Sequence, residues 1–394
     1  MKIAMLATTM PKFPCEAISK NVSILSKELQ KMGHKIKVFT VFRASKDFRT
    51  FLSSSNPLIF PYHYIFSQKR LRDALKIFRP DFSITHFGLL GTNLMLLNYA
   101  NIIPFVYSYP SSLRDCLSLQ REMIGSGLSS GLSDYTHFLN PFCFDNPKIY
   151  RIILERSTLA VFSSENLKET YERFAPRSSV LNLAISDEEL RSSEDITQNR
   201  TMYREKWNLS EKDTAIGFLG HPSFKKGTDL VMETFANLSR ARGEGKLRLM
   251  LATSPYGTLD VNKLLRKFPT TIRKDVRVFN YVHSLEFIGV LDLLLFPLRS
   301  HLGTTAVPRT LLEAILAGTP IIVGNVNPSI QKLCSGTKIG LTTNRSLADL
   351  FSKSNQVLDN LESFRQGVLL ERRRIIPAYH VKRVAKELIQ ALLG

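Results

Sequence analysis

Residues 216–227 read IGFLGHPSFKKG, and residues 292–324 read DLLLFPLRSHLGTTAVPRTLLEAILAGTPIIVG. Each stretch predicts an apolar strand, then a loop of small or basic residues, then a helix, which begins near Gly227 in the first stretch. Units of this kind aim backbone N–H groups and the positive end of a helix at one point, where a phosphate group is well held. Two such units in one chain predict a nucleotide-diphosphate site at the carboxyl ends of a parallel sheet.

The length and composition indicate a globular protein of more than one domain. A chain of 394 residues is long for one core, so we expect two domains of about 150–200 residues each. No apolar run in the sequence is long enough to span a bilayer. The first residues read as a strand rather than a signal peptide, so a cytoplasmic location is expected. The four cysteines have no paired spacing, which predicts neither a zinc site nor a disulfide framework.

The charge is strongly basic. The chain has 53 Lys and Arg residues against 34 Asp and Glu residues, for a net charge of +19. This excess favours anionic partners. Solvated basic faces are the plainest interpretation, and a peripheral position on an anionic membrane face is compatible with the charge. Nucleic acid is disfavoured as a partner because no helix-turn-helix, RNA-binding signature or zinc finger accompanies the basic residues.

The first half of the chain alternates between strand and helix patterns. The expected strands are residues 2–7, 35–42, 82–86, 104–108, 159–163 and 179–183. The expected helices are residues 19–32, 71–78, 91–99 and 165–174. Residues 110–146 are rich in Ser and Gly and are expected to form a long irregular segment, which is often functional in an α/β domain.

A second alternation begins at residue 214. Its expected strands lie near residues 214–219, 246–252, 276–280, 292–296, 320–323 and 338–341, and its helices near 227–241, 258–267, 308–317, 326–333, 345–359 and 379–393. The fold class is therefore α/β, with two doubly wound Rossmann-like domains facing a cleft. We expect an N-terminal domain over 1–186, a polar linker over 187–212, a second domain over 213–375 and a C-terminal helix within 376–394 that crosses back to the first domain.

Three motifs resemble one family of enzymes. The opening MKIAMLATTMPKFP with SILSKELQKMGHKIKVFT, the segment FLGHPSFKKGTDLVMETFANL and the segment VPRTLLEAILAGTPIIVG resemble glycosyltransferases of the GT-B fold, close to the family 4-like retaining group. The resemblance covers nearly the whole chain. It implies an N-terminal domain for the acceptor and a second domain for a nucleotide diphosphate sugar, UDP- or GDP-linked.

The resemblance also implies roles for particular residues. Lys226 would hold the donor diphosphate and stabilise the leaving nucleotide as the sugar–oxygen bond breaks. Glu313 would accept hydrogen bonds from the ribose hydroxyls, because both oxygens of a carboxylate accept. The predicted donor-contacting residues are His221, Lys225, Lys226, Tyr281, Val282, Thr305, Ala306, Val307, Arg309, Thr310 and Glu313. Lys226 and Glu313 could instead be ordinary exposed residues of helices.

The sequence departs from the family pattern at several positions. His221 stands where the family usually has Arg, and Thr305 stands where it has the first of two paired carboxylates, which leaves the donor sugar open. A histidine common in the acceptor domain would fall near Tyr109 and is missing. His86, at the end of an expected strand, is the nearest candidate for that role, although a strand-cap histidine is an equal interpretation.

The implied reaction is sugar transfer with retained anomeric configuration. No metal and no further cofactor is expected, since lysine and helix dipoles would serve the diphosphate. The acceptor would be a saccharide or a lipid-linked molecule in glycan synthesis, and residues 8–18 and 110–146 would bind it. Two alternatives remain. One is a nucleotide-sugar epimerase, for which no convincing carboxylate and histidine set is found. The other is a catalytically degenerate relative that acts as a binding or scaffold protein.

Overall fold

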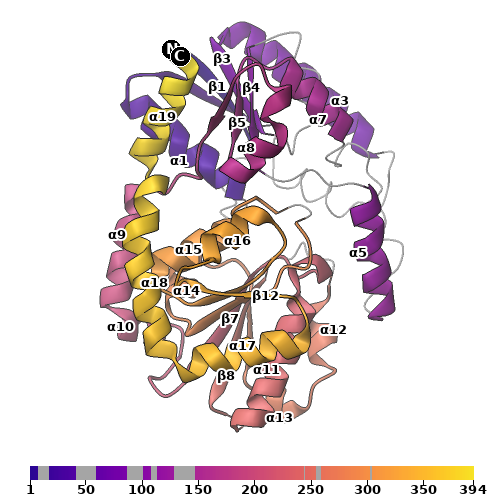
Figure 1. Cartoon of the computed structure of the whole chain (residues 1–394), viewed down its shortest axis with the longest axis vertical. Helices are drawn as coiled ribbons and strands as arrows, with labels where there is room; N and C mark the ends of the chain where they lie inside the picture. The colour runs from indigo at the N-terminus through magenta and orange to yellow at the C-terminus, as the bar shows by residue number, and fades with distance from the viewer. Residues whose placement is uncertain are drawn as a thin grey trace.

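The computed structural model describes residues 1–7, 17–40, 59–86, 101–107, 113–127, 147–243, 245–253, 259–301 and 304–394. Two six-stranded parallel sheets, one above the other in Figure 1, form the centres of two α/β domains. The predicted fold class, two doubly wound Rossmann-like domains, is confirmed. No helix in these ranges is long and apolar enough to cross a membrane.

The first sheet has the strand order β2-β1-β3-β4-β5-β6. Its strands are β1 (Lys2–Ala7), β2 (Lys35–Thr40), β3 (Phe82–His86), β4 (Ile102–Val106), β5 (Ala160–Phe162) and β6 (Ser178–Val180). Every neighbouring pair is parallel. β1 and β4 are buried along almost their whole length, as expected for strands that helices cover on both faces. The order of the strands reverses between β1 and β3, so these two carboxyl ends define the crevice of this domain.

The helices of the first half are α1 (Ala17–Lys31), α3 (Ile59–Phe78), α5 (Leu113–Gly125), α7 (Pro147–Glu155) and α8 (Glu165–Tyr171), which a 3-10 turn η2 (Glu172–Phe174) follows. α1 buries Val22, Leu25 and Leu29 at helical spacing against the sheet. Two expectations differ from the structure. α5 lies inside the segment expected to be irregular, and α3 is longer than the predicted helix. The helix expected over 91–99 lies outside the described residues.

The second sheet has the order β12-β11-β10-β7-β8-β9. Its strands are β7 (Thr214–Gly220), β8 (Leu247–Thr253), β9 (Val276–Phe279), β10 (Leu293–Phe296), β11 (Ile321–Gly324) and β12 (Gly340–Thr343). All six positions were predicted to within a few residues. The strand order reverses between β7 and β10, which are parallel neighbours. Ligands of doubly wound sheets bind outside the carboxyl ends of the strands at such a reversal.

The helices around this sheet include three that the sequence did not predict, α13, α14 and α18. The set is η3 (Phe224–Lys226), α11 (Thr228–Arg242), α12 (Val261–Leu265), α13 (Thr270–Arg273), α14 (Ser284–Gly289), α15 (Arg309–Ala317), α16 (Pro328–Cys334), α17 (Leu347–Asp359) and α18 (Leu361–Ile375). α15 is buried along nearly its whole length. It follows β10, so its N-terminus points at the reversal of the strand order.

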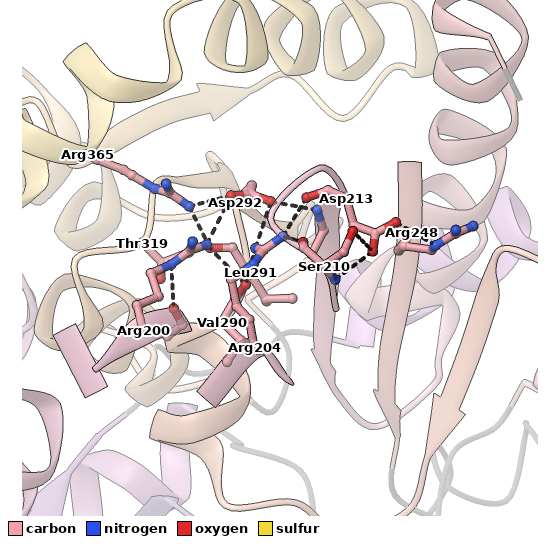
Figure 2. A network of polar contacts seen from close by, with 12 residues as sticks. Arg200, Arg204, Ser210, Asp213, Arg248, Val290, Leu291, Asp292, Thr319 and Arg365 are labelled. Carbon is pink, nitrogen blue, oxygen red and sulfur yellow. Dashed lines mark hydrogen bonds and ion pairs between the residues drawn. The ribbon is translucent and has the colours of Figure 1, made fainter. Parts of the chain in front are cut away.

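The segment between the sheets, predicted as a polar linker, is helical. It forms α9 (Asp187–Gln198) and α10 (Arg200–Lys206). A capping box between Ser186 and Glu189 starts α9. Figure 2 shows Arg200 and Arg204 of this segment converging with Arg365 of α18 on Asp292, which directly precedes β10. The ion pairs attach α10 firmly to the second domain.

The chain crosses between the domains a second time through η4 (Ile376–Tyr379) and α19 (Val381–Leu393). Ile185 and His380 form a parallel bridge at the two crossing points. Asn182 Nδ2 donates to the carbonyl of Ala378 at 3.0 Å, and Arg177 donates to that of Ala391 at 2.9 Å. α19 packs against α1, and both termini of the chain lie at the end of the molecule that the first domain forms (Figure 1).

Candidate active site

Lys226 lies at the reversal of the strand order in the second sheet. Lys226 belongs to η3, in the loop after β7, and the loop after β10 lies beside it. Its Nζ donates to Thr304 Oγ1 at 2.8 Å and lies 5.2 Å from the centre of the Phe296 ring. The lysine therefore joins the two loops where a doubly wound sheet binds its ligand.

Gly227 sets the position of this lysine. Its φ of 71° lies in the left-handed region, which glycine adopts without strain. A Cβ added there would meet the carbonyl oxygen of Pro297 at 2.4 Å, so a larger residue has no room. The backbone of the lysine loop can thus approach the β10 loop closely only because residue 227 is glycine.

Arg299 holds the same loop from the other side. Its guanidinium makes two parallel hydrogen bonds to Asp229, both at 2.6 Å, and a third to the carbonyl of Phe224 at 2.9 Å. It also stacks 3.8 Å from the centre of the Phe224 ring. Arg299 and Asp229 are both buried, and paired forks of this kind fix geometry as well as charge. Arg299 is therefore a positioning residue for Lys225 and Lys226.

The electrostatics of the loop favour an anionic ligand. Burial and the neighbouring charge of Lys225 lower the pKa of Lys226 to about 7. Burial, followed by the charges of Lys226 and Lys225, lowers the pKa of His221 to about 4, so this histidine is neutral at pH 7. A phosphate group here would relieve the repulsion between the two lysines. His221 would offer a neutral N–H donor rather than a charge.

Glu313 is buried on α15, at 4% exposure. Its Oε1 accepts from Ser284 Oγ at 2.9 Å and from Lys20 Nζ at 2.8 Å, and Arg309 Nε lies 3.6 Å from it. All three contacts end on Oε1, and Oε2 takes none of them. The carboxylate thus has an oxygen outside this set that could accept from ribose hydroxyls.

A charged network connects Glu313 to the first domain and to α9. Lys20 Nζ lies 2.7 Å from Glu189 Oε1, and Arg309 also donates to this oxygen. Arg309 donates further to the carbonyl of Ala184 at 2.5 Å. Burial alone would raise the pKa of Glu189, but the charges of Arg309 and Lys20 outweigh it and lower the pKa to about 2. The side chain of Arg309 is used in this network, whereas the sequence predicted that the backbone at this position would contact the donor.

The loop before α15 also touches the first domain. The N–H of Ala306 donates to the carbonyl of Tyr107, just beyond β4, at 2.5 Å. Thr305 Oγ1 donates to the carbonyl of Val307 at 2.8 Å. The N–H of Ala306, a residue predicted to contact the donor, is therefore engaged across the domain boundary in this structure.

The other residues that were predicted to contact the donor or the acceptor differ in how deeply they are buried. Val307 is buried in the core, and Thr310 is half-buried in the first turn of α15. After β9, Tyr281 is 45% exposed and Val282 packs partly on the core. His86 ends β3 opposite Phe105 of β4, but its side chain lies outside the described residues. Within the segments predicted to bind the acceptor, 8–18 and 110–146, residues 8–16, 110–112 and 128–146 also lie outside the described residues.

Sequence reasoning missed three residues that shape this site, namely Lys20, Ser284 and Arg299. Lys20 sits in the first turns of α1 and reaches α15, which is 293 positions away. No local pattern marks such a contact. Arg299 gave a weak signal in the sequence. A charged residue inside the apolar segment FPLRS is expected to have a buried partner of opposite charge.

Comparisons with solved structures agree with the architecture. Sucrose-phosphate synthase from Thermosynechococcus elongatus has a TM-score of 0.73 at 12% identity, with 100% of this chain and 98% of that chain covered. Anabaena HepE in complex with UDP and glucose has a TM-score of 0.65 at 12% identity, covering 100% and 99%. WaaG, a glycosyltransferase involved in lipopolysaccharide biosynthesis, has a TM-score of 0.65 at 17% identity, covering 100% of both chains. No curated protein matches the chain in sequence.

The two facing parallel sheets with their crossing C-terminal helix define the chain as a protein of the GT-B fold, as the sequence predicted. Residues 213–360 match the family model of the glycosyl transferases group 1. This span contains Lys226, Glu313 and the whole second sheet. The chain therefore carries a glycosyl transferases group 1 domain, and the predicted resemblance is confirmed.

Proposed function

We propose that the protein is a retaining glycosyltransferase that uses a nucleotide diphosphate sugar. The observation that carries this proposal is the position of Lys226 at the reversal of the second sheet, joined to the loop before α15 by Thr304. Lys226 and Lys225 would bind the diphosphate and stabilise the charge that develops on the leaving nucleotide. The N-terminus of α15 would add its dipole. The reaction would need no metal.

Glu313 would bind the ribose through its carboxylate, with Ser284 fixing the orientation of the side chain. Tyr281 and Val282 would lie along the base. A related fold, Anabaena HepE, is described in complexes with UDP and with UDP-glucose, which makes UDP the first nucleotide to test. We propose a saccharide or lipid-linked acceptor in glycan synthesis, held by the first domain. WaaG, which is involved in lipopolysaccharide biosynthesis, supports this choice.

A degenerate binding protein is the second candidate, and specific observations favour it. Thr305 is bonded to the carbonyl of Val307 and stands where relatives carry a carboxylate for the sugar. Ala306 N–H and Glu313 are both engaged by residues of the first domain. In a protein that no longer transfers sugar, these contacts would stay in place and hold the two domains together.

Thermal unfolding with UDP, GDP, ADP and their sugar conjugates, without added metal, tests the proposal. A ligand at about 100 times its dissociation constant stabilises by about 2.7 kcal/mol, which a melting curve resolves. We expect one nucleotide to stabilise the wild type and not Lys226→Ala. Release of that nucleotide from its sugar conjugate in the presence of acceptor would then separate the transferase from the degenerate protein. If nucleotide binding survives Lys226→Ala, the site is wrongly assigned.

A further inference from the structure

A pocket lies where the chain crosses between the domains. It has a volume of about 780 Å³, and α9, the end of α18, η4 and the start of α19 form its walls. This volume is in the range of sites for small molecules. None of its lining residues belongs to the candidate active site. α9 and α18 pack against the second domain, whereas α19 packs against α1, so an occupant would touch elements on both sides of the crossing.

The walls of this pocket are basic. Arg372, Arg373, Lys382 and Arg383 line it, against the single carboxylate of Glu194. Arg372 lies 3.6 Å from Glu194, which is longer than a direct hydrogen bond.

Two further basic residues of the rim, Lys382 and Arg383, form exposed ion pairs, and His380 of the wall contacts Asp187 at 2.8 Å. Lys382 pairs with Asp187 at 3.5 Å and Arg383 with Glu387 at 2.7 Å, and the two basic side chains are 63% and 59% exposed. Exposed pairs of this kind contribute little to stability, so an anion of higher charge can replace them.

The pocket is also apolar between these charges. Leu190, Leu369, Ile376 and Pro377 line it. Apolar surface next to a basic rim suits a ligand that has an anionic head and a hydrocarbon part. A nucleotide fits less well, because none of the described lining residues is Phe, Tyr or Trp, the side chains on which bases stack.

We propose that this pocket binds an anionic amphiphile, with a phosphate head between Arg372, Arg373 and Arg383 and an apolar chain against Leu369 and Ile376. The phosphate head could belong to a membrane lipid or to a soluble alkyl phosphate ester, which share this chemistry. The inference is independent of the proposed transferase activity, since no residue of the nucleotide site takes part.

Titration calorimetry on the full chain tests the proposal. The probe is dihexanoyl phosphatidic acid below its micellar concentration, with dihexanoyl phosphatidylcholine and inorganic phosphate as comparisons. We expect the phosphatidic acid to bind at least about tenfold more tightly than either comparison, because only it satisfies both the rim and the apolar wall. Equal binding of inorganic phosphate would overturn the role of the apolar wall and with it the proposal.

Variants locate the binding. Arg373→Gln with Arg383→Gln removes two exposed charges and should weaken phosphatidic acid binding about tenfold or more. Lys263→Gln with Arg266→Gln removes two exposed charges from α12 and should leave binding unchanged. Thr197→Glu, which adds a carboxylate to the wall, should weaken it as well, and melting temperatures will show that each variant is folded. Binding that is equal in all variants would refute the assignment.

Vesicles distinguish the two sources of the ligand. Sedimentation with phosphatidic acid vesicles, but not with phosphatidylcholine vesicles, that depends on Arg373 and Arg383 would support a bilayer lipid. Binding of the short-chain probe with no sedimentation would support a soluble phosphate ester. Sedimentation that is unaffected by the Arg373 and Arg383 double variant would place membrane binding elsewhere and count against this pocket as the lipid site.

Discussion

Lys20 and Glu313 form an ion pair of 2.8 Å between the two domains. The lysine belongs to α1, the carboxylate to α15, and Glu189 of α9 also lies 2.7 Å from the same ammonium. Both carboxylates are largely buried and require compensation, which Lys20 and Arg309 provide. The residue proposed to bind ribose is therefore also one through which the two domains make contact. Lys20 holds Oε1 and the ribose would use the other oxygen, so the two partners share the charge of one carboxylate.

Lys20→Met should raise the affinity for UDP, by about threefold, since the methionine keeps the length of the side chain but no longer occupies Glu313. Lys27→Met, on an exposed position of the same helix, is the matched control and should have no effect. Titration calorimetry measures both. A weaker affinity in Lys20→Met would mean that the ammonium assists the nucleotide rather than competing with it.

Arg299→Lys should weaken UDP binding about tenfold, although Arg299 is not expected to touch the nucleotide. A lysine cannot make the paired hydrogen bonds to Asp229 and would release the η3 loop that carries Lys226. Arg345→Lys is the control, because the Arg345 guanidinium donates to the carbonyl of Arg299, at 2.8 Å, and to that of its neighbour Asn344, and it makes no paired fork with a carboxylate among the described residues. Titrations in the Lys226→Met background, which is expected to keep a lower affinity, give the decisive comparison. If Arg299 acts through Lys226, its substitution has no further effect there.

The central strands β7, β10 and β11 of the second sheet could be read from the sequence because they are apolar runs that end at Gly or directly before Pro. α18 could not be predicted, because its sequence LESFRQGVLLERRRI shows little helical period. Of its residues, only Gly367, Val368 and Ile375 are buried. For α9 a signal was present. Ser186 and Glu189 have capping-box spacing, and this pattern outweighs the polar composition that suggested a linker.

The candidate site was predictable only where it depends on neighbours in sequence. Gly227 and Lys226 follow from a local strand-loop-helix pattern, and the structure places them at the reversal of the strand order. The contacts of Glu313 with Lys20 and of Ala306 with Tyr107 join distant parts of the chain. These contacts arise from how the two domains pack, which periodicity and spacing within one segment do not encode.

The affinity for UDP should fall as the pH rises above 7. Lys226 in the free protein has a pKa of about 7, and the diphosphate favours its charged form, so binding takes up a proton above that pH. Between pH 7 and 9 the dissociation constant should rise, approaching about tenfold per pH unit. Lys226→Arg keeps its charge throughout and should show a flat profile, as should Lys226→Met at lower affinity. A flat profile in the wild type would show that Lys226 stays charged in the free protein.

The lowered pKa of Lys226 also predicts how the free energy of unfolding depends on pH. Its pKa in the folded protein lies below its ordinary value of 10.5, so the unfolded chain binds more protons between pH 7 and 10.5. The contribution of Lys226 to the free energy of unfolding should therefore rise with pH across this window. Denaturant titrations at pH 7 and pH 9 should show a larger gain for the wild type than for Lys226→Met. An equal gain would indicate that the lysine is well solvated.

Asp292→Ala should destabilise the second domain by about 3–5 kcal/mol, because three arginines would lose their common buried carboxylate. Asp292 Oδ2 accepts from Arg204 at 3.1 Å and from the N–H of Ala215 at 2.7 Å, while Arg200 and Arg365 share Oδ1 (Figure 2). Burial, followed by the charge of Arg365, already lowers the pKa of Arg200 to about 10, so this cluster tolerates little further loss of negative charge.

Tryptophan fluorescence can follow this unfolding selectively. Trp207 is the only tryptophan of the chain, and its ring centre lies 5.0 Å from that of Phe279 in the second domain. Asp359→Ala, which breaks an exposed pair with Arg242, is the matched control and should cost less than about 1 kcal/mol. If Asp292→Ala costs no more than this control, the arginines find water or other acceptors, and the network does not hold α10 and α18 to β10. A loss of stability near the expected value would show that Asp292 holds α10 and α18 against the second domain.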